Sequence, residues 1–159
     1  MTLPESRVAD AHKMEADGIV YLYTIMPKAG GIIRVKNDNT VTWQGETWEG
    51  MACQLDQRGQ NADGTRVRPK FTFANPEGAF SALVSGGVLN NAQVIETQVL
   101  YTDLLADNPA CVTHTWILRR IVQLGRDGIQ VELRDVTDGQ AFNLPLRQFR
   151  PPSFPTVTM

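Results

Sequence analysis

The sequence predicts an all-β fold, a barrel or sandwich-like arrangement of about seven to eight mostly antiparallel strands with two short helices. Residues 41–48 have the pattern of a tight hairpin, in which Gly45 supplies the positive φ that a short turn requires. Residues 111–124 and 129–136 form a second hairpin pattern around a glycine-bounded turn. Residues 66–73 alternate strictly, which is typical of a strand with one packed and one solvated face. The packed positions are Val67, Pro69, Phe71 and Phe73, and the solvated ones are Arg66, Arg68, Lys70 and Thr72.

Length and composition favour one globular domain. The chain has 159 residues, of which 42% are hydrophobic and 20% charged, with a formal charge of −2, so no basic footprint for a dedicated nucleic-acid binder is present. No apolar run approaches the roughly 20 residues that span a bilayer. The first residues lack the order of a secretory signal, so we expect synthesis in the cytoplasm. Cys53 and Cys111 are too few and too far apart for a disulfide framework or a zinc site, and we expect buried thiols.

The N-terminal half is expected to begin with a helix over residues 4–17. Ser6 is its predicted N-cap, and Val8, Ala11 and Met14 fall on one apolar stripe. Residues 19–26 are dense in β-branched and aromatic side chains with little polar relief, which predicts a central strand covered on both faces. Turns at residues 27–31 and 37–39 bracket another strand at 32–36, and a polar loop is expected at 56–65.

In the C-terminal half, Pro76 introduces a second short helix over residues 79–84, which Gly86 and Gly87 end. A long strand follows at 92–102, and a polar loop at 103–109. The core-facing set of that strand is expected to be Ile95, Thr97, Val99 and Tyr101. From residue 144 the chain becomes proline-rich, which excludes a central strand and indicates an extended arm or linker. We therefore expect one β-rich domain over residues 1–148 and an arm over 149–159.

Candidate chemistry is sparse. There is no phosphate-binding glycine motif, and residues 85–87 are expected to be a simple connection. His114 lies in an apolar-rich strand and His12 on a polar helix face, so neither is assigned as a general base. Together with Cys53 and Cys111 they could supply four metal ligands, but no close pair anchors such a site. Asp103, Asp107, Asp135 and Asp138 are interpreted as turn residues. No catalytic, cofactor-binding or metal-binding residue is predicted, and we expect no enzyme.

Two surface features have a functional and a structural interpretation. The basic face formed by Arg66, Arg68 and Lys70 could contact phosphate, but a solvated face that protects a sheet edge is favoured. Trp43 and Trp48 could stack on a sugar ring, but packing across the hairpin is favoured.

Several segments resemble the phage minor tail protein L family of long-tailed phages. They are residues 41–45, 68–75, 83–86, 101–103 and 142–147, and their shared order extends the resemblance over most of residues 6–148. The resemblance implies a structural part of the tail tip, between the ring that ends the tail tube and the central hub or fibre protein, usually in three copies. Implied partners are the distal tail ring, the hub or fibre protein, the tape measure and copies of the chain itself, with no specific nucleic acid and no membrane.

Members of this family often carry a second, cysteine-rich module thought to hold an iron–sulfur cluster. Cys53 and Cys111 do not match the cluster cysteines, so the resemblance concerns the family's N-terminal domain only and no cofactor is expected here. Either this lineage does without the second module, or the sequence covers only the first domain of a longer protein. Two alternatives remain at this point. One is a carbohydrate- or receptor-binding module that uses Trp43, Trp48 and Tyr21 or Tyr23, which requires an exposed tryptophan. The other is a hydrolase that works through His114.

Overall fold

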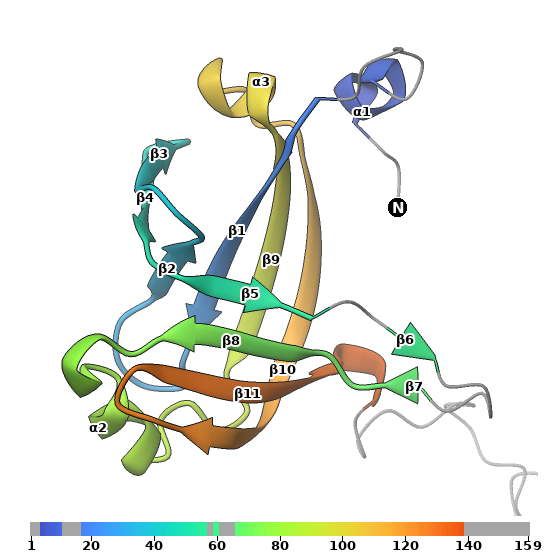
Figure 1. Cartoon of the computed structure of the whole chain (residues 1–159). Helices are drawn as coiled ribbons and strands as arrows, with labels where there is room; N and C mark the ends of the chain where they lie inside the picture. Colours follow the sequence, from blue (N-terminus) through green and yellow to red (C-terminus); the bar gives the residue numbers. More distant parts are fainter. Residues whose placement is uncertain (1–3, 11–16, 57–58, 61–65, 139–159) are drawn as a thin grey trace, which may run out of the picture.

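The computed structural model describes residues 4–10, 17–56, 59–60 and 66–138. The predicted all-β class is confirmed, because long and short strands dominate and every helix is short (Figure 1). The strands are β1 (Ile19–Met26), β2 (Ile33–Lys36), β3 (Val41–Trp43), β4 (Glu46–Gly50), β5 (Cys53–Leu55), β6 (Gly59–Gln60), β7 (Arg66–Val67), β8 (Lys70–Ala74), β9 (Gln93–Leu100), β10 (Cys111–Leu124) and β11 (Gly128–Asp135). The helices are α1 (Glu5–Asp10), α2 (Ser81–Ser85) and α3 (Tyr101–Leu105), with 3₁₀ turns η1 (Pro76–Gly78) and η2 (Val136–Asp138).

One nine-stranded sheet forms the body of the molecule, in the order β3-β4-β2-β1-β9-β10-β11-β8-β5. The segment from β4 to β5 closes this sheet on itself. At its start Gly50 pairs with Lys36 of β2, and the Met51 amide donates to the Lys36 carbonyl at 2.9 Å. Further along, the Ala52 carbonyl accepts from the Ala74 amide at 2.8 Å, next to β8. Because one segment bonds to β2 and then to β8, the sheet curls into a barrel.

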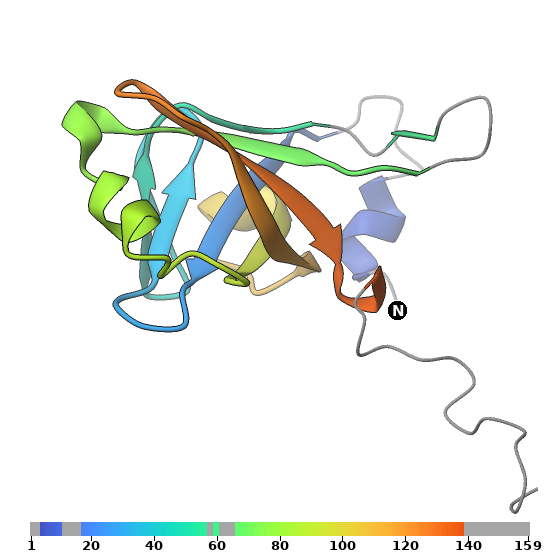
Figure 2. The ribbon, with the colours of Figure 1, turned by 90° about the horizontal axis from the view of Figure 1, so that it is seen from below.

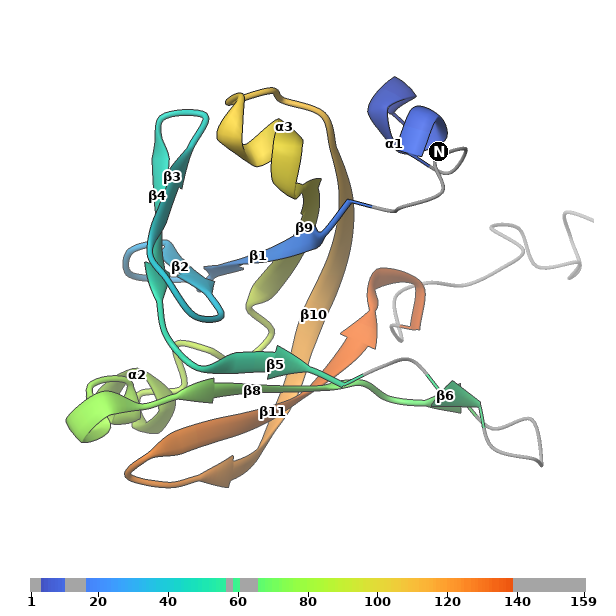
Figure 3. The ribbon, with the colours of Figure 1, turned by 45° about the horizontal axis from the view of Figure 1, so that its top comes forward.

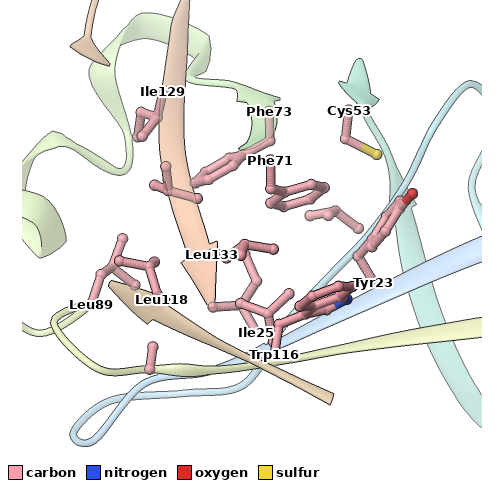
Figure 4. Packing of buried hydrophobic residues seen from close by; sticks show 14 residues of the cluster. Tyr23, Ile25, Cys53, Phe71, Phe73, Leu89, Trp116, Leu118, Ile129 and Leu133 are labelled. Carbon is pink, nitrogen blue, oxygen red and sulfur yellow. The ribbon is translucent and has the colours of Figure 1, made fainter. Parts of the chain in front are cut away.

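The barrel interior is filled by the main hydrophobic core (Figure 4). The predicted alternation in residues 66–73 is confirmed where side chains are described, since Pro69, Phe71 and Phe73 are buried while Arg68 and Lys70 are exposed. The strand itself is divided into β7 and β8, and β7 pairs with β6 in a separate two-stranded ribbon. Proline has no amide hydrogen to donate, which accounts for the break at Pro69.

One end of the barrel is covered by the segment between β8 and β9 (Figure 2). Phe80, Leu83 and Val84 pack against the main core, and Leu89 is fully buried. The predicted second helix is thus present, shifted to Ser81–Ser85 and preceded by the η1 turn that Pro76 begins.

A second cluster covers the outer face of β1 and β9. Trp43 and Trp48 of the β3–β4 hairpin and Leu104 of α3 pack there against Leu22 and Val99. Leu22 belongs to this outer cluster and Tyr23 to the main core, so β1 is covered on both faces around its middle, as expected. The hairpin turn has Gln44 at φ 52° and Gly45 at φ 75°, the left-handed pair that suits a two-residue connection.

Three expectations were wrong. Helix α1 begins at Glu5, so Ser6 lies inside it and not at its N-cap; Val8 is exposed, and Ala11 and Met14 lie outside the described residues. The strand at 92–102 ends at Leu100, because the chain turns there into α3, and Tyr101 is exposed. The expectation that β9 has a single core-facing set was also wrong. Val94 and Glu96 are buried as well as Thr97 and Val99, because the barrel core covers one face of β9 and the hairpin cluster covers the other.

Among the helices of the described residues, none has the length and apolar character needed to span a membrane. The predicted arm at 149–159 lies outside the described part of the chain.

Candidate functional site

A groove of about 560 Å³ lies between β5 and the strands β1, β9 and β10. Strand register builds one wall in two rows. Tyr21, Gln98 and Val112 form the first row, and Tyr23, Glu96 and His114 form the second. Residues 53–56 form the opposite wall, so the groove runs between strands that are far apart in the sheet order. Figure 3 shows the course of β5 and of β1, β9 and β10. The segment between β8 and β9, which contains α2 and is called the α2 segment below, leads into the start of β9. The two rows of groove residues lie further along β9, at Glu96 and Gln98.

Glu96 is a buried carboxylate at the base of this groove, 7% exposed. It accepts from the Gln98 amide Nε2 at 3.2 Å and from the Trp116 indole Nε1 at 3.3 Å. Within the described residues no lysine or arginine forms an ion pair with it. Removing a carboxylate from water without a cation is costly, so this position favours a positively charged group entering the groove.

Tyr23 and Cys53 face each other across the core side of the groove (Figure 4). The Tyr23 ring packs on Phe71 with centroids 4.7 Å apart. Burial, and then the Glu96 carboxylate, raise the pKa of Tyr23, so its hydroxyl stays protonated at neutral pH. Burial raises the pKa of the Cys53 thiol to about 11. Both cysteines are free thiols, and the expected burial holds for Cys53, whereas Cys111 is only partly buried.

His114 packs edge-on against Trp116, with ring centroids 4.2 Å apart, and its Nε2 lies 3.9 Å from Asp135 Oδ2. The imidazole is therefore a packed, half-buried member of the groove wall, as the strand context predicted. Cys53, the thiol that lines the same groove, is held neutral by burial, which raises its pKa and makes it a poor nucleophile. The geometry therefore gives no support to the hydrolase alternative.

The other candidate ligands do not come together. In the part of the chain that the structure describes, no group of three or more His, Cys, Asp and Glu residues could hold a metal ion, and His12 lies outside it. Asp103 accepts from Asn108 Nδ2 at 2.9 Å, and Asp107 accepts from the Gln44 amide at 2.7 Å. Asp107 thus acts as a turn residue, as interpreted. The interpretation was wrong for Asp103, which is a buried residue of helix α3 and not part of a polar loop.

The hairpin tryptophans are structural. Trp43 and Trp48 are each 6% exposed, their rings lie 6.0 Å apart, and Trp43 Nε1 donates to the Asn108 carbonyl at 3.0 Å. Trp116 is buried too. Packing across the hairpin is confirmed. The carbohydrate alternative requires an exposed tryptophan, and the structure contradicts that requirement because Trp43, Trp48 and Trp116 are all buried.

A buried carboxylate of β11 organises a basic cluster formed by one arginine just before β8 and two arginines of β10. Glu132 is only 8% exposed at its side chain. It accepts from Arg119 Nη1 at 2.7 Å, Arg120 Nε at 2.8 Å and Arg68 Nη1 at 3.3 Å. The basic face is therefore partly neutralised rather than simply solvated. The opposite charges of Lys70 and Glu132, which are paired in register, were the available signal.

Comparison with known proteins identifies the family. The family model of phage minor tail protein L matches residues 29–151, which include the strands β2 to β11 and the groove residues that come from β5, β9 and β10, whereas β1 precedes the match. The chain belongs to the phage minor tail protein L family. The resemblance noted from the sequence is thus confirmed, and this L-family chain is a structural protein of the phage tail.

A solved structure has a similar fold. A chain from "Virion of native gene transfer agent (GTA) particle" superposes on the L-family chain with a TM-score of 0.60 at 15% identity, over 92% of this chain and 48% of that one. At this identity the likeness concerns the fold. The L-family chain spans about half the length of that structure's chain.

Proposed function

We propose that this protein is a subunit of the tail tip that connects the ring at the end of the tail tube to the central hub or fibre protein. The family match over residues 29–151 carries the proposal. Its partners would be the distal tail ring, the hub or fibre protein and the tape measure, with three copies arranged around the tail axis. Residues 1–148 would form its β-rich domain and 149–159 an extended arm. Its role is assembly, without catalysis or a cofactor.

An exposed apolar end of the barrel supports a role in assembly. Ile19, Tyr21, Tyr101 and Leu105 are 42%, 42%, 51% and 70% exposed. Ile19 pairs in register with Leu100, and the Tyr101 amide donates to the Gly18 carbonyl at 2.8 Å, so the start of β1 and the start of α3 lie together (Figure 1). We call these four side chains the apolar end. Exposed apolar side chains gathered at one place are typical of protein–protein contacts.

The proposed ring of copies requires a contact that closes around the tail axis. A heterologous contact between two different faces of one chain closes into a ring when its rotation permits. The apolar end offers one such face, which would lie against a different face of the next copy or against the neighbouring ring protein.

Electron cryo-microscopy of complete virions tests the proposal directly. The expected map has the barrel at the tail tip, between the tube-terminal ring and the hub, repeated three times around the axis. A map that places the chain along the tube, or only on an external fibre, contradicts it. A biochemical companion is co-purification with the ring protein, with the tube protein of the same virion as the matched control.

A further inference from the structure

The groove between β5 and β1–β9–β10 has a composition that selects a particular kind of ligand. Its described lining includes two carboxylates, Glu96 and Asp56, and neither lysine nor arginine. Asp135 adds a third carboxylate beside His114 at the border. A cationic group is therefore favoured in the groove, and Glu96 is the position where it would gain most, because that carboxylate is buried and its hydrogen bonds to the described residues come from neutral donors.

The groove is also lined by aromatic side chains. They are Tyr21, which is 42% exposed, and the buried Tyr23 and Trp116. Aromatic-lined grooves bind extended proline-rich segments, because a polyproline helix loses little conformational entropy on binding and its rings stack on aromatic faces. A guanidinium can in addition stack over a tyrosine ring.

The chain itself contains a segment with these properties. Residues 144–155 read LPLRQFRPPSFP, which contains four prolines, two arginines and no carboxylate. The segment lies outside the described residues, but the point from which it departs is known. The described chain ends in η2 directly after Asp135, whose carboxylate lies 3.9 Å from His114 in the groove wall. Twelve residues separate positions 138 and 150, and an extended chain of that length reaches about 40 Å.

We propose that residues 144–155 bind along this groove as an extended strip, with the Arg150 guanidinium on Glu96 and the following prolines against Tyr21. The same groove would accept this segment from its own chain or from a neighbouring copy, because the recognition chemistry is identical. The inference does not depend on where in the tail the protein is located, so it can hold or fail independently of the proposed tail-tip role.

Trypsin cleavage of the full chain provides the first test. The bond after Arg147 is a good substrate, whereas the bond after Arg150 precedes proline and resists cleavage, so one cut reports on the segment. We expect slow cleavage after Arg147 in the native chain. Glu96→Gln and, separately, Arg150→Gln should each accelerate it about tenfold, the factor expected for loss of one charge-assisted hydrogen bond. Glu49→Gln, which changes an exposed carboxylate on β4, should leave the rate unchanged.

Arg150→Gln keeps the test valid even if Glu96→Gln impairs folding, because position 150 lies outside the barrel strands. Its second readout is the nuclear magnetic resonance signal of the Trp116 indole N–H, which donates to Glu96. This signal should shift in Arg150→Gln, while those of Trp43 and Trp48, in the outer cluster, should not. Dependence of protection on protein concentration would identify a neighbouring copy as the donor, and independence would identify the same chain.

The proposal is overturned if the bond after Arg147 is cut in the native chain as fast as in a synthetic peptide of residues 143–159. It is equally overturned if the Arg150→Gln variant leaves both the cleavage rate and the Trp116 signal as in the native protein.

Discussion

Two buried carboxylates of the same sheet show how individual residues set the chemistry of this protein. Glu132, on the outer face, accepts from three guanidinium groups. Glu96, on the groove face, accepts from an amide and an indole among the residues that the structure describes. The first is compensated within its own barrel, although its arginines are largely exposed and contribute modestly to stability. The second has no lysine or arginine partner among the described residues, so the proposed binding of Arg150 should affect Glu96 and leave Glu132 unchanged.

At the residue scale, Cys53 should make stability fall in alkaline solution. Its pKa in the folded protein is about 11, whereas an unfolded cysteine ionises near 8.5. An acid whose pKa is raised by folding contributes stability that is complete below the unfolded pKa and is lost as pH rises toward the folded pKa. The free energy of unfolding should therefore decline between about pH 9 and 11.

Urea unfolding of the native chain and of Cys53→Ala across that pH range measures the effect. The decline should be shallower in Cys53→Ala, and the part that remains belongs to Tyr23 and Cys111, whose pKa values are also raised by burial. Cys111→Ala is the comparison, and it should change the decline less than Cys53→Ala because this thiol is only partly buried. Parallel curves for the native chain and Cys53→Ala would contradict the assignment.

At the scale of elements, the parts that local pattern specifies were predictable. The hairpin at 41–48 was identified because a Gln-Gly turn requires positive φ, and β8 because its alternation matches one buried face. The end of β9 was not predictable, since nothing local in residues 99–102 opposes a continued strand. The groove was not predictable either. Glu96 and Trp116 are twenty residues apart, and only the β9–β10 register brings the indole to the carboxylate.

Asn75 is the residue that joins elements most directly, and Asn75→Ala should destabilise the barrel. Its fully buried side chain donates to Ser81 Oγ at 3.0 Å and to the Gly125 carbonyl at 2.9 Å, and it accepts from the Phe80 amide at 2.9 Å. It thus connects the end of β8, the α2 segment and the β10–β11 turn. Loss of these bonds should lower the free energy of unfolding by about 2–4 kcal/mol.

Chemical denaturation checks this value against Asn90→Ala, an exposed asparagine of the same segment, for which a change within about 0.5 kcal/mol is expected. Equal destabilisation by both substitutions would show that Asn75 has no special role in joining these elements.

At the scale of the whole molecule, the barrel has three surface regions, and Tyr21 belongs both to the groove and to the apolar end. The α2 segment covers the main core at one end, the groove opens between β5 and β1–β9–β10, and the apolar end gathers at the start of β1 and α3. A subunit that bound a partner only through the groove would have no need of the apolar end. The proposed assembly contact therefore predicts that changes at the apolar end impair assembly while leaving the fold intact.

Leu105→Glu is the sharpest test of that contact, because Leu105 is 70% exposed on α3 and its replacement should leave stability within about 0.5 kcal/mol. A glutamate buried in a protein contact should weaken association by about 2 kcal/mol, roughly thirtyfold. Val122→Glu is the matched control, since Val122 is exposed near the opposite end of β10. Complementation of a virion that lacks this protein measures assembly, and thermal unfolding measures the fold. If both variants assemble equally well, the apolar end is not the contact, because a charge placed inside an apolar interface cannot be accommodated without loss of affinity.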